Sequence, residues 1–365
     1  MKFNIQKSTL LDGLQTVQSV VSTRPARPVD ANVLIAADEQ GLTLTTTNGE
    51  IFIRCTVAAE VPENGSTTLP VKRLFSIVRE LQEGVIEVTV GDDNVAKINA
   101  GSSKFRLNGI AATEFAAVPV PGDGSICYSL ERAPFMDTLR KTVYAASAED
   151  SRPILNSVLL NFLDGKLTTV ATDGRRLAMV EKEVEFPKEN NKDIVLPTRV
   201  ISYLLGIVEG EGELQVHVKD TLAIFESGTT MLSCKLVDGV YPNFRQVVVK
   251  QCENRIALPR EELLAVLRRM MIFTNEKNNS IRLTFEDNLL TVSANTPEIG
   301  EAKDSIAIKY AGPVISVIFN PAFVVDPLKA IGDDSVYMEL NDANSPGLIK
   351  SEKDDFLYVI MPLRV

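Results

Sequence analysis

Side chains that commonly carry out catalysis are scarce in this sequence of 365 residues. The single histidine, His217, lies in an alternating stretch, 214–218, which predicts a strand position facing solvent rather than the general base of a catalytic triad. The four cysteines form no CxxC motif, and with one histidine they argue against a zinc site. We expect them to be reduced thiols, mostly buried in strands. They are Cys55, Cys127, Cys234 and Cys252.

Paired carboxylates are the other candidates for acid–base or metal chemistry. Each pair lies in a turn-like setting, where carboxylates are usually solvated. The pairs are Asp92-Asp93, Glu149-Asp150, Asp333-Asp334 and Asp354-Asp355. The sequence therefore favours a protein without catalytic residues, metal or cofactor. A hydrolase that uses the acidic turns is the alternative.

Charge is distributed unevenly between the expected helices and the remainder of the chain. The net charge of −10 argues against a generic nucleic-acid binder. The expected helical windows contain thirteen basic and seven acidic residues, which leaves −16 for all other residues. This separation fits a protein that holds a polyanion against its helices, and it also fits helices that are merely solvated by Lys and Arg. The windows are 7–22, 71–81, 132–146, 198–208, 260–277 and 322–331.

The elements that carry these residues repeat three times along the chain. Leu167–Val180 predicts a β-hairpin with a turn at Asp173-Gly174. Similar strands begin at Leu42 and Leu290, so the spacings from Leu167 are 125 and 123 residues. A second marker before a helix-like run keeps nearly the same spacing, at Leu69-Pro70, Leu196-Pro197 and Asn320-Pro321. We therefore predict three modules, at residues 1–121, 122–250 and 251–365.

Each module has the predicted order strand, long helix, three strands, strand, short helix and three strands. This order is typical of an α+β protein with antiparallel sheets, and the absence of βαβ alternation argues against a doubly wound nucleotide-binding fold. No run of about 18 apolar residues predicts a membrane span. The first residues lack the apolar region of a secretory signal. We expect a cytoplasmic protein.

Several motifs, together with the threefold repeat, resemble the bacterial DNA polymerase III β subunit family of sliding clamps. They are TDGRRLA at 172–178, KLVDGVYP at 235–242, NEK at 275–277 and VIMPLR at 359–364. The resemblance implies three clamp modules, each with two helices packed on antiparallel sheets, and a head-to-tail homodimer that closes a six-module ring around duplex DNA. It implies a non-catalytic DNA polymerase processivity factor. A peptide-binding scaffold that encircles nothing is the alternative.

The resemblance also implies partners and sites. The partners are double-stranded DNA bound without sequence specificity, a second copy of the chain, the replicative DNA polymerase, the clamp loader and other proteins with clamp-binding peptides. The implied peptide pocket comprises Leu155, Thr172, Gly174, Arg175, Arg176, Leu177, Pro242, Val247, Ile360, Met361, Pro362, Leu363 and Arg364. Two positions depart from the familiar pattern, because Arg175 replaces a histidine and Gln246 replaces a basic residue.

Two further sets of residues follow from the same resemblance. For ring closure between module one of one copy and module three of the other, the resemblance implies basic residues on the last strand of module one, acidic counterparts in module three and an apolar pair. These are Lys104, Arg106, Ile272, Phe273, Glu298, Glu301 and Asp304. For DNA phosphates we expect basic residues from helices and neighbouring loops. These are Arg24, Arg73, Arg79, Arg140, Lys141, Arg152 and Arg199.

Overall fold

The computed structural model describes residues 1–208, 210–248, 252–353 and 355–364, which fold into two compact units. Unit 1 consists of Met1–Ala133 and Arg199–Leu236, and unit 2 consists of Pro134–Thr198 and Val237–Val365. The predicted module boundary between residues 250 and 251 lies outside the described residues. The α+β prediction is confirmed, because every strand pairing in the named sheets is antiparallel and helices contribute the smaller share.

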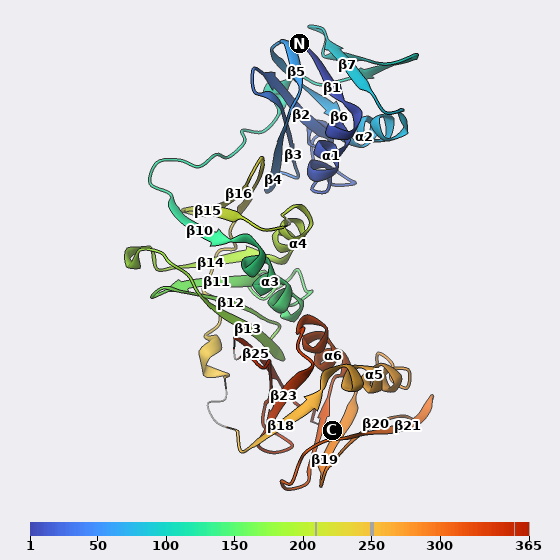
Figure 1. Cartoon of the computed structure of the whole chain (residues 1–365), viewed down its shortest axis with the longest axis vertical. Helices are drawn as coiled ribbons and strands as arrows, with labels where there is room; N and C mark the ends of the chain where they lie inside the picture. Colours follow the sequence, from blue (N-terminus) through green and yellow to red (C-terminus); the bar gives the residue numbers. More distant parts are fainter. Residues whose placement is uncertain (209, 249–251, 354, 365) are drawn as a thin grey trace. The chain divides into compact units, whose positions relative to one another are not determined.

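The elements follow the repeated order expected from the sequence (Figure 1). The first repeat contains β1 Lys2–Gln6, α1 Lys7–Gln18, β2 Asn32–Asp38, β3 Gly41–Thr47, β4 Ile51–Val57, β5 Glu60–Glu63, β6 Gly65–Pro70, α2 Val71–Glu80, β7 Val85–Val90, β8 Val95–Ala100 and β9 Ser103–Asn108. The second contains β10 Ile126–Glu131, α3 Arg132–Thr142, β11 Ser157–Leu163, β12 Lys166–Thr172, β13 Arg176–Glu183, β14 Lys192–Pro197, α4 Thr198–Ile207, β15 Glu213–Lys219, β16 Leu222–Ser227 and β17 Thr230–Lys235. The third contains β18 Asn254–Pro259, α5 Arg260–Met271, β19 Ile281–Glu286, β20 Leu289–Thr296, β21 Gly300–Ala307, β22 Ile315–Phe319, α6 Pro321–Ala330, β23 Ser335–Leu340, β24 Gly347–Lys350 and β25 Phe356–Ile360.

Unit 1 is built on an eight-stranded sheet in the order β10-β15-β16-β17-β4-β3-β2-β6 and a five-stranded sheet in the order β5-β1-β7-β8-β9. Helices α1 and α2 pack against each other and against strands of this unit, as Figure 1 shows. Their buried faces carry Leu10, Leu14 and Leu74, which are at most 2% exposed. The helices form because these apolar residues recur at helical spacing and lie over the apolar face of a sheet.

Unit 2 repeats the same architecture. Its eight-stranded sheet has the order β14-β11-β12-β13-β25-β24-β23-β18, and its four-stranded sheet has the order β21-β20-β19-β22. Helices α5 and α6 pack against each other. Along β11, four consecutive residues, Ser157–Leu160, are buried, which shows that this strand is covered on both faces. Leu159 belongs to a cluster that includes Tyr241 and Phe244, so the segment after β17 covers the second face.

Each of the two units contains elements of more than one repeat, because strands from neighbouring repeats share a sheet. In unit 1, β17 pairs with β4, and in unit 2, β25 pairs with β13. Both pairings are antiparallel and join strands from different repeats. Backbone hydrogen bonds between repeats therefore define the compact units.

The predicted repeat is visible at atomic level in two hairpin turns. In the first, Thr47 Oγ1 donates to the Ile51 carbonyl at 2.9 Å and accepts from Gly49 N–H. In the second, Thr172 Oγ1 donates to the Arg176 carbonyl at 2.6 Å and accepts from Gly174 N–H. The positions are 125 residues apart, as the sequence spacing indicates. The same local sequence has thus produced the same turn twice.

Several details differ from the sequence-based expectations. The hairpin turn contains three residues between β12 and β13, not only the predicted pair Asp173-Gly174. Four strands, β5, β6, β14 and β22, were given no residue range from the sequence, although the predicted order includes one strand before each short helix. Strand β5 contains Pro62 and only one residue that is not exposed, so it lacks a strong strand pattern. Strand β22 is a short, mostly apolar run of five residues, and periodicity alone does not distinguish such a run from a segment of buried helix.

Candidate functional site

An apolar cavity of about 250 Å³ lies in unit 2. It contains nine of the thirteen residues that we expected in a peptide pocket. These are Leu155, Thr172, Gly174, Arg175, Arg176, Leu177, Pro242, Val247 and Met361. The structure adds Asn243, Phe244 and Val359. The volume is below that of typical sites for drug-sized ligands, so the cavity suits one or two apolar side chains of a longer ligand.

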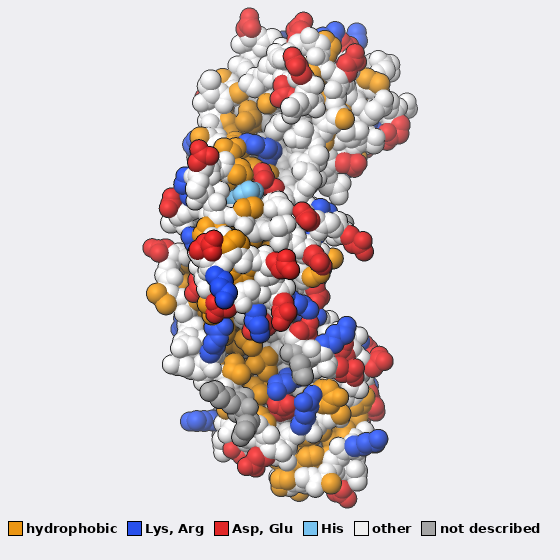
Figure 2. All heavy atoms as spheres, turned by 60° about the vertical axis from the view of Figure 1, so that its left-hand side comes forward, with side chains coloured by type: hydrophobic (Ala, Val, Ile, Leu, Met, Phe, Trp, Pro, Cys, Tyr) orange, Lys and Arg blue, Asp and Glu red, His pale blue; other side chains and the backbone are white. Residues whose placement is uncertain are grey.

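The floor and the rim of this cavity differ in exposure. Leu177, Phe244 and Val359 are buried and belong to the same hydrophobic cluster as Leu159, on the face of the eight-stranded sheet that the segment after β17 covers. Val247 and Met361, in contrast, are 39% and 37% exposed. Figure 2 brings the side of unit 2 that carries the short helix Phe244–Gln246 toward the reader and shows hydrophobic side chains gathered on its surface. The cavity is therefore an extension of the core that opens to solvent.

The turn between β12 and β13 forms one wall and is held by its own side chains. Asp173 Oδ1 accepts hydrogen bonds from the backbone N–H groups of Arg175 and Arg176 at 2.8 and 3.0 Å. Gly174 has a φ of +87°, a conformation that residues with a side chain rarely adopt. Met361 N–H donates to the Arg175 carbonyl at 2.9 Å, which ties the chain after β25 to the same turn. Hydrogen bonds within the chain thus hold this wall in place.

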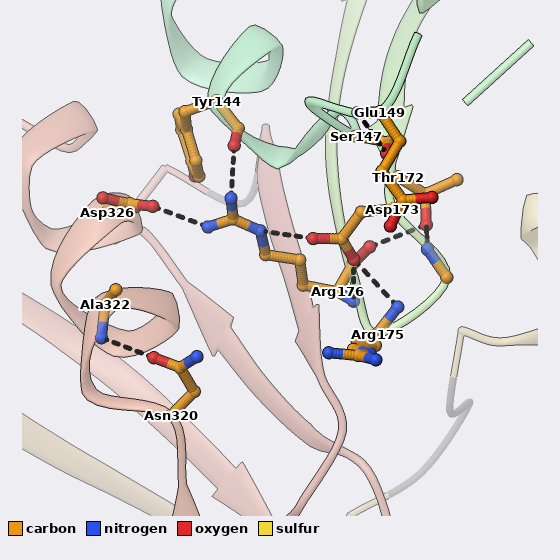
Figure 3. A network of polar contacts seen from close by, with 11 residues as sticks. Tyr144, Ser147, Glu149, Thr172, Asp173, Arg175, Arg176, Asn320, Ala322 and Asp326 are labelled. Carbon is orange, nitrogen blue, oxygen red and sulfur yellow. Dashed lines mark hydrogen bonds and ion pairs between the residues drawn. The ribbon is translucent and has the colours of Figure 1, made fainter. Parts of the chain in front are cut away.

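Arg176 lies beneath this wall and is the centre of a polar cluster (Figure 3). Its guanidinium donates to Asp173 Oδ2 at 3.0 Å, Asp326 Oδ2 at 2.6 Å and the Tyr144 carbonyl at 2.6 Å. It also lies 4.3 Å from the centroid of the Phe323 ring. Only 11% of its side chain is exposed. Arg176 therefore connects the turn to α6 and to the chain after α3.

Burial affects two tyrosines near this cluster. The rings of Tyr144 and Tyr358 lie 6.0 Å apart, and burial raises the pKa of both phenols well above the ordinary value of 10.0. Both side chains therefore remain neutral at physiological pH. The positive charge of Arg176 is balanced by the two carboxylates, Asp173 and Asp326.

Four of the expected pocket residues do not line the cavity. Ile360 is fully buried in the sheet, since it is the last residue of β25 and points into the core. Pro362, Leu363 and Arg364 follow it, and Leu363 N–H donates to the Ile318 carbonyl of β22 at 2.8 Å. The chain thus leaves the cavity after Met361 and continues along an edge strand. Phe244, which sequence reasoning missed, follows Pro242 in a loop between repeats, and that apolar run was the available signal.

The predicted DNA-contacting residues differ in whether their side chains form ion pairs within the chain. All are exposed except Lys141, whose Nζ lies 2.7 Å from Asp137. Arg79 and Arg152 also form ion pairs, with Glu80 at 3.0 Å and Glu149 at 3.5 Å. In the described part of the chain, no ion pair involves the remaining four, Arg24, Arg73, Arg140 and Arg199. The six helices contain twelve basic and six acidic residues, so they keep the net charge of +6 expected from the sequence.

Two of these arginines come together in unit 1. Arg24 and Arg199 line a cavity of about 380 Å³ with Asn48, Glu50 and Tyr203. The cavity brings the loop after α1 close to the beginning of α4. The other five predicted residues do not line this cavity.

The residues expected at a dimer interface lie at two sheet edges, which belong to different units. Lys104 and Arg106 are exposed on β9, where Phe105 between them is 36% exposed. Ile272 follows α5 and is 71% exposed, and Phe273 is half-buried beside it. Glu298 and Glu301 are exposed at the beginning of β21. Asp304 on β21 is already paired within the chain, because Arg269 Nη2 lies 2.6 Å from its Oδ2.

Candidate catalytic residues form no catalytic arrangement in the described structure. His217 is not freely solvated as expected, because its Nε2 lies 3.1 Å from Glu226 Oε2. The cysteines are free, but only Cys55 and Cys234 are buried and Cys127 is exposed, so the expectation of mostly buried thiols was only half right. Asp354 of the predicted carboxylate pair lies outside the described residues. Across the described ranges, no group of three His, Cys, Asp or Glu side chains could hold a metal, and no helix could span a membrane.

The fold and the cavity define a repeat protein whose candidate site is suited to binding another chain. Models of the DNA polymerase III beta subunit match the N-terminal domain at 1–119, the central domain at 129–243 and the C-terminal domain at 245–364. The chain is 34% identical to the beta sliding clamp of Chlamydia muridarum, with alignment over 100% of this chain and 99% of the relative. The beta sliding clamp of Pseudomonas aeruginosa is 33% identical with complete coverage of both chains.

Solved structures give the same result. A crystal structure of a DnaN sliding clamp, DNA polymerase III subunit beta, from Pseudomonas aeruginosa bound to griselimycin has a TM-score of 0.96 and 32% identity, and covers 100% of both chains. A sliding clamp from Bacillus subtilis also has a TM-score of 0.96, with 25% identity and 100% and 99% coverage. The chain belongs to the DNA polymerase III beta subunit family, the beta sliding clamps, which are non-catalytic processivity factors of DNA polymerase III.

Proposed function

We propose that two copies of this chain join head to tail into a closed ring on duplex DNA and tether the replicative polymerase to it. The observation that carries this proposal is the repeated strand pairing of β17 with β4 and β25 with β13. Strands β9, β17 and β25 are the last strands of the three repeats. Strands β4, β13 and β21 are the third strands after the long helix of each repeat. The pairings of β17 with β4 and of β25 with β13 therefore join a last strand to a third strand, and β9 and β21 are the last and the third strand that remain. Within the described residues, β9 and β21 are edge strands of their sheets. A second copy supplies the missing antiparallel partner for each edge.

The apolar residues beside these edges support an interface. Phe105 is 36% exposed on β9, and Ile272 is 71% exposed close to β21. Exposed strand edges attract other strands, and exposed apolar side chains beside them favour a specific contact over chance pairing. Lys104 and Arg106 on one edge face Glu298 and Glu301 of the second copy in this arrangement, so opposite charges set the register.

The proposed contact with DNA is electrostatic and independent of base sequence. The helices carry a net +6 within a chain of net charge −10, and the exposed residues Arg24, Arg73, Arg140 and Arg199 are free for phosphates. Phosphate contacts hold a protein on DNA without reading bases. Because these contacts are few, the ring slides, and enclosure rather than tight binding keeps it on the duplex. A clamp loader that uses ATP opens the ring, and the protein works in the cytoplasm.

The cavity of about 250 Å³ is the proposed attachment point for the polymerase, the clamp loader and other partners. Its apolar floor accepts Leu or Phe side chains of a short linear peptide. Tethering a polymerase through such a peptide raises its effective concentration at the primer end by multivalency.

Primer extension on a singly primed circular template tests the tethering. The reaction contains the replicative polymerase, a clamp loader and ATP, and compares the full chain with a variant that lacks residues 361–365. We expect the variant not to stimulate synthesis, because the polymerase and the clamp loader both lose their attachment point, while its circular dichroism equals that of the full chain. Full stimulation by the truncated chain contradicts the proposed role of the cavity.

A further inference from the structure

We propose that Arg175 selects partner peptides that carry a carboxylate next to their apolar anchor; this inference rests on the proposed peptide-binding function of the cavity. Arg175 lines the cavity and is exposed. Its backbone N–H is bound by Asp173, whereas its guanidinium has no ion pair in the described part of the chain. Figure 3 shows its side chain turned away from the Arg176 cluster. A free, fixed-charge donor thus lies at the rim of an apolar cavity.

The neighbouring arginine cannot play the same part. The guanidinium of Arg176 is engaged by Asp173, Asp326 and the Tyr144 carbonyl and is 11% exposed. An incoming carboxylate would have to displace buried partners to reach it, which is costly for a charged hydrogen-bonded group. The two consecutive arginines therefore have different roles, because Arg176 holds the wall and Arg175 faces the ligand.

The nearest carboxylate on the wall does not neutralise Arg175. Asp173 is 15% exposed, and both of its oxygens are occupied, Oδ1 by two backbone N–H groups and Oδ2 by Arg176. Glu149 lies on the opposite side of the turn in Figure 3 and is paired with Arg152 at 3.5 Å. The rim at Arg175 thus keeps its positive charge.

A second cation, Arg245, lies next to the cavity, and no ion pair with a carboxylate involves it in the described residues. Arg245 stacks on the cavity residue Phe244, with its guanidinium 4.7 Å from the ring centroid, and its only hydrogen bond in the described structure is to Asn161 at 3.4 Å. Guanidinium groups bind carboxylates with two parallel hydrogen bonds, so this rim favours an acidic peptide over a neutral or basic one.

Fluorescence polarisation with two labelled peptides tests the inference on the full chain. Both peptides carry the same Leu and Phe anchors, and they differ only in a Glu or a Gln directly before the anchors. The wild-type chain should bind the Glu peptide about three- to tenfold more tightly at low salt, and the preference should shrink at high salt. Arg175→Gln should bind both peptides equally, so that the preference for the Glu peptide is lost.

Arg268→Gln is the matched control, because Arg268 is also an exposed arginine of unit 2 but does not line the cavity. It should keep the full preference for the Glu peptide. Equal binding of the two peptides to the wild type, or an undiminished preference in Arg175→Gln, overturns the role of Arg175 while the peptide pocket stands. Binding of neither peptide overturns the proposed pocket and this inference with it.

Discussion

Arg176 and Asp326 are 150 residues apart in the sequence, yet the guanidinium Nη1 and the carboxylate Oδ2 lie 2.6 Å apart. This ion pair connects the beginning of β13 to α6, so it joins elements of two successive repeats within unit 2. The same guanidinium holds Asp173 in the turn that forms a wall of the apolar cavity. The stability of the junction and the shape of the cavity thus depend on one residue.

Asp326→Asn should destabilise unit 2. The substitution keeps the size of the side chain but leaves the largely buried charge of Arg176 with one carboxylate instead of two. We expect the free energy of unfolding to fall by about 1–3 kcal/mol in urea titrations. Glu149→Gln is the control, because the Glu149–Arg152 pair is more than 60% exposed on both sides and should contribute less than about 0.5 kcal/mol. Equal effects of the two substitutions contradict the proposed role.

Local sequence patterns predicted most of the fold. The six helices begin at or within one residue of the expected positions after each strand, because apolar residues at helical spacing identify a buried helix face. The repeat spacing predicted that Thr47 and Thr172 are equivalent, and their hydrogen bonds are the same. The pairing of β17 with β4 could not be predicted from strand patterns alone, since an edge strand shows the same alternation whichever neighbour it has.

The candidate site was less predictable than the fold. The resemblance supplied the residues on the turn, but it could not indicate that Arg175 and Arg176 point in different directions. That difference depends on Asp326, Tyr144 and Phe323, which are distant in sequence from the turn. Ile360 was expected in the pocket, and its burial follows from the alternation along β25, which places it on the core side.

Met361→Ala should weaken peptide binding without unfolding the chain. Met361 is 37% exposed at the rim of the cavity, so truncation of its side chain should lower the free energy of unfolding only slightly. The truncation does remove apolar contact with a side chain bound in the cavity. We expect the dissociation constant, measured by fluorescence polarisation, to rise about tenfold. Leu363→Ala is matched in exposure, also 37%, but lies outside the cavity lining and should change affinity by less than about twofold. Comparable losses in both variants argue against a specific pocket.

Ile272→Asp should convert the dimer into monomers. Ile272 is 71% exposed near β21, and a carboxylate there would be placed against the apolar part of the proposed interface. Light scattering coupled to gel filtration at micromolar concentration should give the mass of one chain, 40.0 kDa, instead of two. Val314→Asp is the control, since Val314 is 70% exposed immediately before β22 at the opposite edge of the same sheet. A monomeric wild type, or a monomeric Val314→Asp variant, contradicts the proposed interface.

The Asp304–Arg269 pair should produce a pH-dependent contribution to stability. The hydrogen bond from Arg269 lowers the pKa of Asp304 below its ordinary value of 3.8. A lowered pKa in the folded state stabilises the chain above the unfolded-state pKa, and this contribution is lost as the pH falls through the folded-state value. The difference in unfolding free energy between the wild type and Asp304→Asn should therefore be constant above about pH 5 and shrink progressively as the pH falls below 3.8 toward the lowered folded-state pKa.

Urea titrations from pH 7 to pH 3 measure this difference. Lys303→Gln serves as the control, because it changes the adjacent residue but keeps the carboxylate, so its pH dependence should match that of the wild type. A difference for Asp304→Asn that persists unchanged at pH 3 shows that the pair has no ionic contribution to folding.

Release from cut DNA tests the enclosure of the duplex most directly. The chain is loaded by a clamp loader and ATP onto a nicked circular plasmid, washed at high salt and then exposed to a restriction enzyme that cuts once. We predict that the protein stays on the intact circle and leaves within minutes of linearisation, because only a closed ring resists salt yet slides off an end. Retention on the linear DNA, or equal loss from the uncut circle, would contradict a clamp that encloses DNA.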